Sequence, residues 1–96
     1  MTFFFRVHYT AGSLRLKAEL IYKSSQVERF KISGKNRYII IQNNHPQIID
    51  HITGKTKGKV KWKLFEGELN DVELLIAIVN TVDDYRRQFK KSPQMT

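Results

Sequence analysis

The sequence feature with the clearest chemical potential is a series of lysines at every second position: Lys55, Lys57, Lys59, Lys61 and Lys63. Side chains two positions apart lie on the same face of a β-strand, so a strand over residues 59–65 would align the last three ammonium groups. Such a row can contact successive phosphates of a nucleic acid. Lysines also keep exposed strands soluble and prevent them from pairing with other chains. The spacing leaves both interpretations open.

The distribution of charge favours a polyanion partner if the basic residues of the strands share one face. Up to Phe65 the chain has thirteen basic and three acidic residues, a net charge of +10, whereas the remainder has four basic and six acidic residues, a net charge of −2. A basic surface of this kind attracts phosphate groups. We predict a nucleic-acid-binding surface that consists of Lys57, Lys59, Lys61, Lys63, Arg15, Lys17 and Arg37.

The sequence offers no residues for catalysis or for metal binding. It has no cysteine, and its three histidines, His8, His45 and His51, have no closely spaced carboxylate pair to complete a ligand set. Gly54-Lys55-Thr56 lacks the earlier glycine of a phosphate-binding loop, because position 49 is isoleucine, and a strand rather than a helix is predicted to follow. We predict a protein that is not an enzyme and has no metal site and no cofactor.

The elements that must position the basic residues form a meander. Turn-forming residues recur about every ten residues, a spacing typical of short antiparallel strands. Six strands are predicted, over residues 2–10, 14–23, 27–32, 37–42, 47–53 and 59–65. In the second and the last of these strands, alternation places Tyr22 and Trp62 on the core side.

The end of the chain has the pattern of an amphipathic helix. Asn70 is a candidate N-cap, Glu73 stands in the capping-box position, and Leu69 and Leu74 could form a hydrophobic staple. An apolar stripe then recurs at helical spacing through Ile78, Val82 and Tyr85. We expect one α+β domain over residues 1–91, an antiparallel meander sheet of five or six strands curved around one C-terminal helix, with residues 92–96 as a frayed tail.

One strand is apolar on both faces. Tyr38, Ile39, Ile40 and Ile41 require cover on each side, which predicts either a central position in the sheet or a homodimer contact through these residues. No apolar run approaches the roughly 20 residues of a membrane span, and the start of the chain lacks the pattern of a secretory signal. We expect a cytoplasmic protein without a membrane partner.

Three segments carry a resemblance: residues 43–46 (Asn-Asn-His-Pro), 61–63 (Lys-Trp-Lys) and 66–69 (Glu-Gly-Glu-Leu). Together with the capped helix, they resemble short uncharacterised bacterial proteins of about this length, a resemblance that covers most of the chain and implies no activity. The predicted topology is similar to the repeat of the PUR family, which binds single-stranded nucleic acid, although no residue motif is shared. The function expected is a small binding module with a basic sheet surface for nucleic acid or another polyanion. The alternative is a protein-interaction or homodimerisation module.

Overall fold

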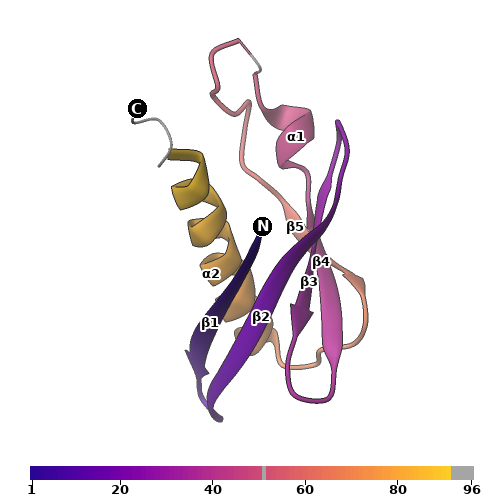
Figure 1. The fold of residues 1–96 in the computed structure, drawn as a ribbon, viewed down its shortest axis with the longest axis vertical. Coiled ribbons are helices and arrows are strands. Elements are labelled where there is room, and N and C mark those ends of the chain that lie inside the picture. The colour runs from indigo at the N-terminus through magenta and orange to yellow at the C-terminus, as the bar shows by residue number, and fades with distance from the viewer. Residues whose placement is uncertain (51, 92–96) are drawn as a thin grey trace.

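An antiparallel sheet and one long helix make up most of the chain. The computed structural model describes residues 1–50 and 52–91. The elements are β1 (Thr2–Tyr9), β2 (Gly12–Lys23), β3 (Glu28–Ser33), β4 (Tyr38–Asn43), α1 (His45–Ile48), β5 (Trp62–Glu66) and α2 (Val72–Lys91) (Figure 1). The five strands are neighbours in chain order, β1-β2-β3-β4-β5, and every pair is antiparallel. The predicted α+β meander with a C-terminal helix is therefore confirmed, whereas the predicted frayed tail lies outside the described residues.

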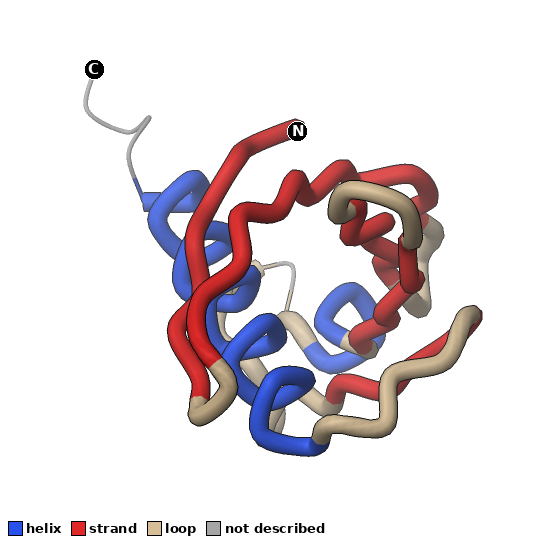
Figure 2. Tube along the Cα trace, turned by 90° about the horizontal axis from the view of Figure 1, so that it is seen from below, coloured by secondary structure: helices blue, strands red, loops and turns tan. Residues whose placement is uncertain are grey.

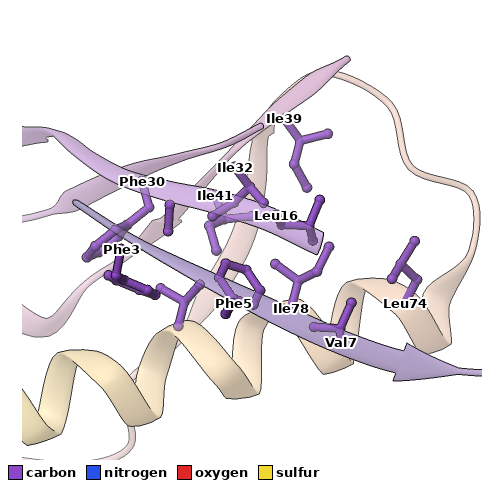
Figure 3. Packing of buried hydrophobic residues seen from close by; sticks show 12 residues of the cluster. Phe3, Phe5, Val7, Leu16, Phe30, Ile32, Ile39, Ile41, Leu74 and Ile78 are labelled. Carbon is purple, nitrogen blue, oxygen red and sulfur yellow. The ribbon is translucent and has the colours of Figure 1, made fainter. Parts of the chain in front are cut away.

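The core lies between the inner face of the curved sheet and the apolar stripe of α2. Alternate residues of the strands point inward, as the period of two requires, and the helix supplies one residue per turn. The buried cluster comprises Phe3, Phe5, Val7, Leu16, Ala18, Phe30, Ile32, Ile39, Ile41, Leu74, Ile78 and Val82 (Figure 3). The sheet curves around this cluster, so its outer face is convex (Figure 2). Tyr85 of α2 stacks on Phe3 of β1, with ring centroids 4.2 Å apart, which fixes the helix on the first strand.

The prediction of a strand over residues 47–53 is wrong. Residues His45–Ile48 form the short helix α1, in which Pro46 occupies the first turn, where a missing N–H costs nothing. Ile49 then forms only an isolated bridge to Thr56. The Asp50 side chain accepts hydrogen bonds from the backbone N–H groups of Ile52 and Thr53, at 2.8 and 3.2 Å, and this turn ends any extended pairing.

The last strand begins three residues later than predicted. β5 starts at Trp62, and the preceding residues are not paired in the sheet. The backbone N–H of Lys61 donates instead to the side-chain oxygen of Asn44, at 2.8 Å. An asparagine in the loop after β4 therefore takes the hydrogen bond that a strand neighbour would have received.

The predicted helix cap is wrong by one residue. The carboxylate of Asp71, rather than the side chain of Asn70, accepts a hydrogen bond from the backbone N–H of Leu74, at 3.1 Å. Glu73 therefore does not occupy the capping-box position, and its carboxylate accepts a hydrogen bond from the hydroxyl of Thr10 in the β1–β2 turn. Two adjacent residues can both cap, and the sequence pattern does not distinguish them.

The apolar strand β4 finds its cover within the chain. Ile39, Ile40 and Ile41 are all buried, whereas Tyr38 is half exposed. β4 is an interior strand, with β3 on one side and β5 on the other, and the cross-strand neighbours of Ile40 are Lys31 and Glu66. No helix in the described ranges is long and apolar enough to cross a membrane.

Candidate functional site

The convex side of the sheet, here called the outer face, carries most of the basic residues of the strands. The cross-strand register and the alternation of burial place six cations on it: Arg6, Arg15, Lys17, Arg29, Lys31 and Lys63. Among the described strand residues, only Glu19 and Glu66 bring negative charge to the same face. The ammonium group of Lys17 lies 3.8 Å from the Glu19 carboxylate, and both side chains are partly exposed, so this pair neutralises little of the field. The outer face is therefore basic.

Two β-bulges shape the aromatic content of this face. In β2 the register shifts between Leu20 and Tyr22, so that Ile21 is the extra residue and Tyr22 lies opposite Arg29. In β5 a second shift between Ile41 and Ile40 makes Phe65 the extra residue. A bulge re-aims the side chains that follow it. Tyr22, predicted on the core side by simple alternation, is in fact 46% exposed, and Phe65 is 44% exposed.

The two bulges bring Tyr22 and Phe65 to the same guanidinium group. The Cζ atom of Arg29 lies 4.5 Å from the Tyr22 ring centroid and 4.0 Å from that of Phe65. Its Nε donates to the side-chain oxygen of Gln42, at 2.8 Å, which fixes the plane of the guanidinium. We call Tyr22, Arg29 and Phe65 the Arg29 stack. Stacks of aromatic rings and guanidinium planes are surfaces on which unpaired bases can lie.

A second pair of a cation and an aromatic ring lies further along β3 and β4. The ammonium group of Lys31 is 4.6 Å from the centroid of the Tyr38 ring. The Tyr38 hydroxyl donates to the Glu66 carboxylate, at 2.9 Å. This hydrogen bond, then the negative charge of Glu66 and then desolvation, raises the pKa of Tyr38 above its ordinary value. Tyr38 therefore presents its ring to a cation while its hydroxyl is bound to a carboxylate.

Like charges meet on the first two strands. Arg6 and Arg15 are direct cross-strand partners, and both are exposed. Opposed like charges destabilise a strand pair unless an anion lies between them. In the described part of the chain no carboxylate forms an ion pair with either guanidinium. These two side chains are suited to bind an external anion such as phosphate.

The predicted site residues fall into three groups. Arg15, Lys17 and Lys63 share the outer face with the Arg29 stack. Lys57, Lys59 and Lys61 are exposed in the segment that leads into β5 and are not part of the strand. Arg37 lies in the β3–β4 turn, where its Nη2 donates to the carbonyl oxygen of Glu68, at 2.8 Å. The structure thus brings together part of the predicted set.

Sequence reasoning missed the residues that form the centre of the outer face. Arg29 and Lys31 belong to the thirteen basic residues that precede Phe65 but not to the predicted site, and Phe65 is not part of that site either. The available signal was the row Arg29, Lys31 and Ser33 on the polar side of an alternating strand. The bulges had no recognisable signal, because neither involves a glycine or a proline.

A polar cluster is buried at the other side of the sheet. Arg86 of α2 is 3% exposed, and its guanidinium lies 3.9 Å from the carboxylate of Glu28 and 3.0 Å from that of Asp83. Glu28 also accepts a hydrogen bond from the side chain of Asn43, at 3.0 Å. Nε and Nη1 of Arg86 and the indole nitrogen of Trp62 are buried and have no hydrogen-bond partner within the described chain. The ion pair between Arg86 and Glu28 joins α2 to β3, and the hydrogen bond from Asn43 to Glu28 extends the cluster to β4.

The described residues offer no metal centre. No group of three or more histidine, aspartate or glutamate side chains lies close enough to hold an ion in the ranges 1–50 and 52–91. His51 lies outside these ranges. The outer face, with its cations and exposed rings, is the best-defined candidate site in the described part of the chain.

Comparison with known proteins gives no relative from which a function could be transferred. No protein-family model, no curated protein and no solved structure matches this chain.

Proposed function

We propose that this protein is a small non-enzymatic binding module whose outer face binds single-stranded nucleic acid. The observation that carries the proposal is the Arg29 stack, in which two bulges turn exposed rings towards a guanidinium on a basic sheet. Single-strand binding generally combines a positive surface that follows the backbone with rings on which bases stack. The cytoplasmic location expected from the sequence stays a prediction.

The proposed contacts divide by chemistry. Lys57, Lys59, Lys61 and Lys63, together with Arg15, Lys17 and Arg37, would bind phosphates, while Tyr22 and Phe65 would present their exposed ring surfaces to bases. Duplex DNA pairs and stacks its own bases, so it cannot use the rings. We therefore expect single strands to bind more tightly than duplexes of the same length.

The direct experiment is fluorescence anisotropy of a labelled single-stranded oligonucleotide titrated with the protein over a series of salt concentrations. If five of these seven residues contact phosphates at the same time, the slope of log affinity against log salt is about −3.5 for a single strand. Replacement of Lys59, Lys61 and Lys63 by glutamate is expected to abolish binding while the circular dichroism spectrum stays that of the folded protein. Binding that survives would remove these lysines from the mechanism.

A matched pair of variants separates a local contact from total charge. Lys63→Gln on the outer face and Gln88→Glu on α2 each lower the net charge by one, and both positions are exposed. We expect Lys63→Gln to weaken binding more than Gln88→Glu. Equal losses would show that the oligonucleotide responds only to the overall charge of the protein.

A second candidate function is self-association. It is favoured by the exposed apolar side chains of Phe4 and Ile21, which lie on strands of the same sheet. The isoleucines of β4, through which a homodimer was predicted, are buried in the single chain and offer little surface for a partner. Light scattering over a range of protein concentrations tests this candidate. An obligate dimer has twice the monomer mass at every concentration, whereas a monomer mass at high concentration would count against self-association.

A further inference from the structure

An apolar cleft opens where the sheet divides. β2 is longer than β3, and the residues from Gly12 to Leu16 pair with β1 alone, because pairing with β3 begins at Lys17 and Ser33. The β1–β2 and β3–β4 turns therefore diverge at one end of the molecule (Figure 1). A cleft of about 1000 Å³ lies here, between β2, the β3–β4 turn and the start of α2.

The floor of the cleft is aliphatic. It consists of Leu14, Leu16, Ile32, Ile39, Leu69, Leu74 and Ile78, and Phe4, Tyr9 and Tyr38 also line the cleft. Five of these belong to the buried core, and Figure 3 shows that Leu16, Ile39, Leu74 and Ile78 lie at the same end of it. Leu14 is 37% exposed, so the apolar surface continues from the core to solvent. The volume is at the upper end of the range found for small-molecule sites, which are mostly apolar with a few polar groups.

The rim of the cleft has one sign of charge. Arg15, Lys17, Lys35 and Arg37 line it, and no acidic side chain of the described residues does so. Aliphatic floor and cationic rim together match a molecule with an alkyl chain at one end and a negative charge at the other. The proposed function accounts for Arg15, Lys17 and Arg37 at the rim as phosphate contacts. It does not account for the aliphatic floor, because a nucleic acid has no saturated chain with which to fill it.

We propose that this cleft binds a monomeric long-chain carboxylate of the fatty-acid type. The alkyl chain lies against Leu14, Leu16 and Ile78, and the carboxylate lies among the guanidinium and ammonium groups of Arg15, Lys17 and Arg37. Charge-assisted hydrogen bonds from arginine suit a carboxylate in particular. The same tail with a positive headgroup meets repulsion at the rim.

Isothermal titration calorimetry of the full chain tests the proposal with four probes: dodecanoate, octanoate, acetate and dodecyltrimethylammonium, each below the concentration at which it forms micelles. We expect one dodecanoate per chain, with an affinity at least about tenfold above that of octanoate, because each buried methylene contributes about a fourfold factor. Acetate and the cationic amphiphile are expected to show no measurable binding. Equal binding of dodecanoate and dodecyltrimethylammonium, or no binding of dodecanoate, would overturn the proposal.

Two variants of β2 provide the matched control. Leu14→Asp places a negative charge at the mouth of the cleft, whereas Ile21→Asp makes the same change at an exposed position of the same strand that does not line it. Dodecanoate affinity should fall at least tenfold in Leu14→Asp and less than twofold in Ile21→Asp. Equal affinities in the two variants would place the ligand elsewhere. Vesicles of phosphatidylglycerol that bind wild type and Leu14→Asp alike, without dodecanoate binding, would indicate a membrane surface in place of a site for a free carboxylate.

Discussion

Replacement of Glu28 by glutamine should destabilise the fold far more than a conservative surface change, because it leaves the buried guanidinium of Arg86 without its carboxylate on the sheet. The two groups are 3.9 Å apart, and both side chains are almost fully buried. Removal of one partner of a buried pair costs about 3–5 kcal/mol. Asp83, 3.0 Å from Arg86, still compensates part of the charge, so the lower end of this range, about 3 kcal/mol, is expected.

Replacement of the other partner, Arg86, should lower the free energy of unfolding less than replacement of Glu28. Arg86→Met removes two buried nitrogens that have no hydrogen-bond partner, while Glu28 keeps its hydrogen bond from Asn43 and its ion pair with Lys23, 3.8 Å away. Loss of the ion pair destabilises the fold, whereas removal of the unpartnered donors stabilises it. We therefore expect the free energy of unfolding to fall by only about 1 kcal/mol. The double variant should be about as stable as Arg86→Met alone, which gives a coupling free energy of about 3 kcal/mol.

Urea unfolding followed by the fluorescence of Trp62, the only tryptophan, measures all three variants. With a denaturant slope of about 1–2 kcal/mol/M for a chain of this size, a loss of 3 kcal/mol moves the midpoint by about 1.5–3 M. If Glu28→Gln leaves the protein unfolded, recovery of folding in the double variant carries the same information. Additive losses would refute the claim that the pair holds α2 to the sheet. A Glu28→Gln protein as stable as Arg86→Met would contradict the expected difference between the two single variants.

Three further predictions concern single positions. Gly67→Ala should lower the free energy of unfolding by about 1–3 kcal/mol, because Gly67 has φ +94° and an added Cβ would lie 3.0 Å from a backbone oxygen. Gly54→Ala, with φ +76° and open space around the added Cβ, should lower it less. Equal unfolding midpoints of the two variants would contradict this prediction. Glu66→Gln should lower the pKa of Tyr38 towards its ordinary value, as followed by ultraviolet absorbance. The stability from this hydrogen bond is present below the ordinary tyrosine pKa and is lost as pH rises through the raised value. A Tyr38 pKa that is the same in Glu66→Gln and wild type would exclude the hydrogen bond. Asp71→Ala should lower the free energy of unfolding by about 1 kcal/mol, and a neutral effect would show that Asp71 is not the helix cap.

The sequence predicts the elements of this fold where one pattern dominates. The alternation of Leu16 and Ala18 with charged residues and the stripe of Leu74, Ile78 and Val82 each specify a face, and both faces are buried as predicted. The failures lie where a local hydrogen bond competes with the pattern. Pro46 begins a short helix in place of a strand, and the side chain of Asn44 holds Lys61 outside the sheet.

The candidate site could be predicted only in part, because its centre depends on register. Arg15, Lys17 and Lys63 follow from alternation alone and share the outer face. Tyr22 and Phe65 reach Arg29 only because each follows or forms a bulge, and a shift of one residue moves a side chain from one face to the other. Such a shift leaves no mark in composition or spacing.

The central claim is that the Arg29 stack presents base-stacking rings on a basic surface. The most direct test compares the affinities of wild type, a Tyr22→Leu/Phe65→Leu variant and Ile21→Leu for one single-stranded oligonucleotide and for its duplex. Leucine keeps apolar bulk beside Arg29 but removes the rings, and stacking contributes about 1–3 kcal/mol per base. We predict that wild type and Ile21→Leu prefer the single strand and that the double variant loses at least about tenfold in single-strand affinity while its duplex affinity is unchanged. Equal affinities of wild type and the double variant for the single strand would contradict the account.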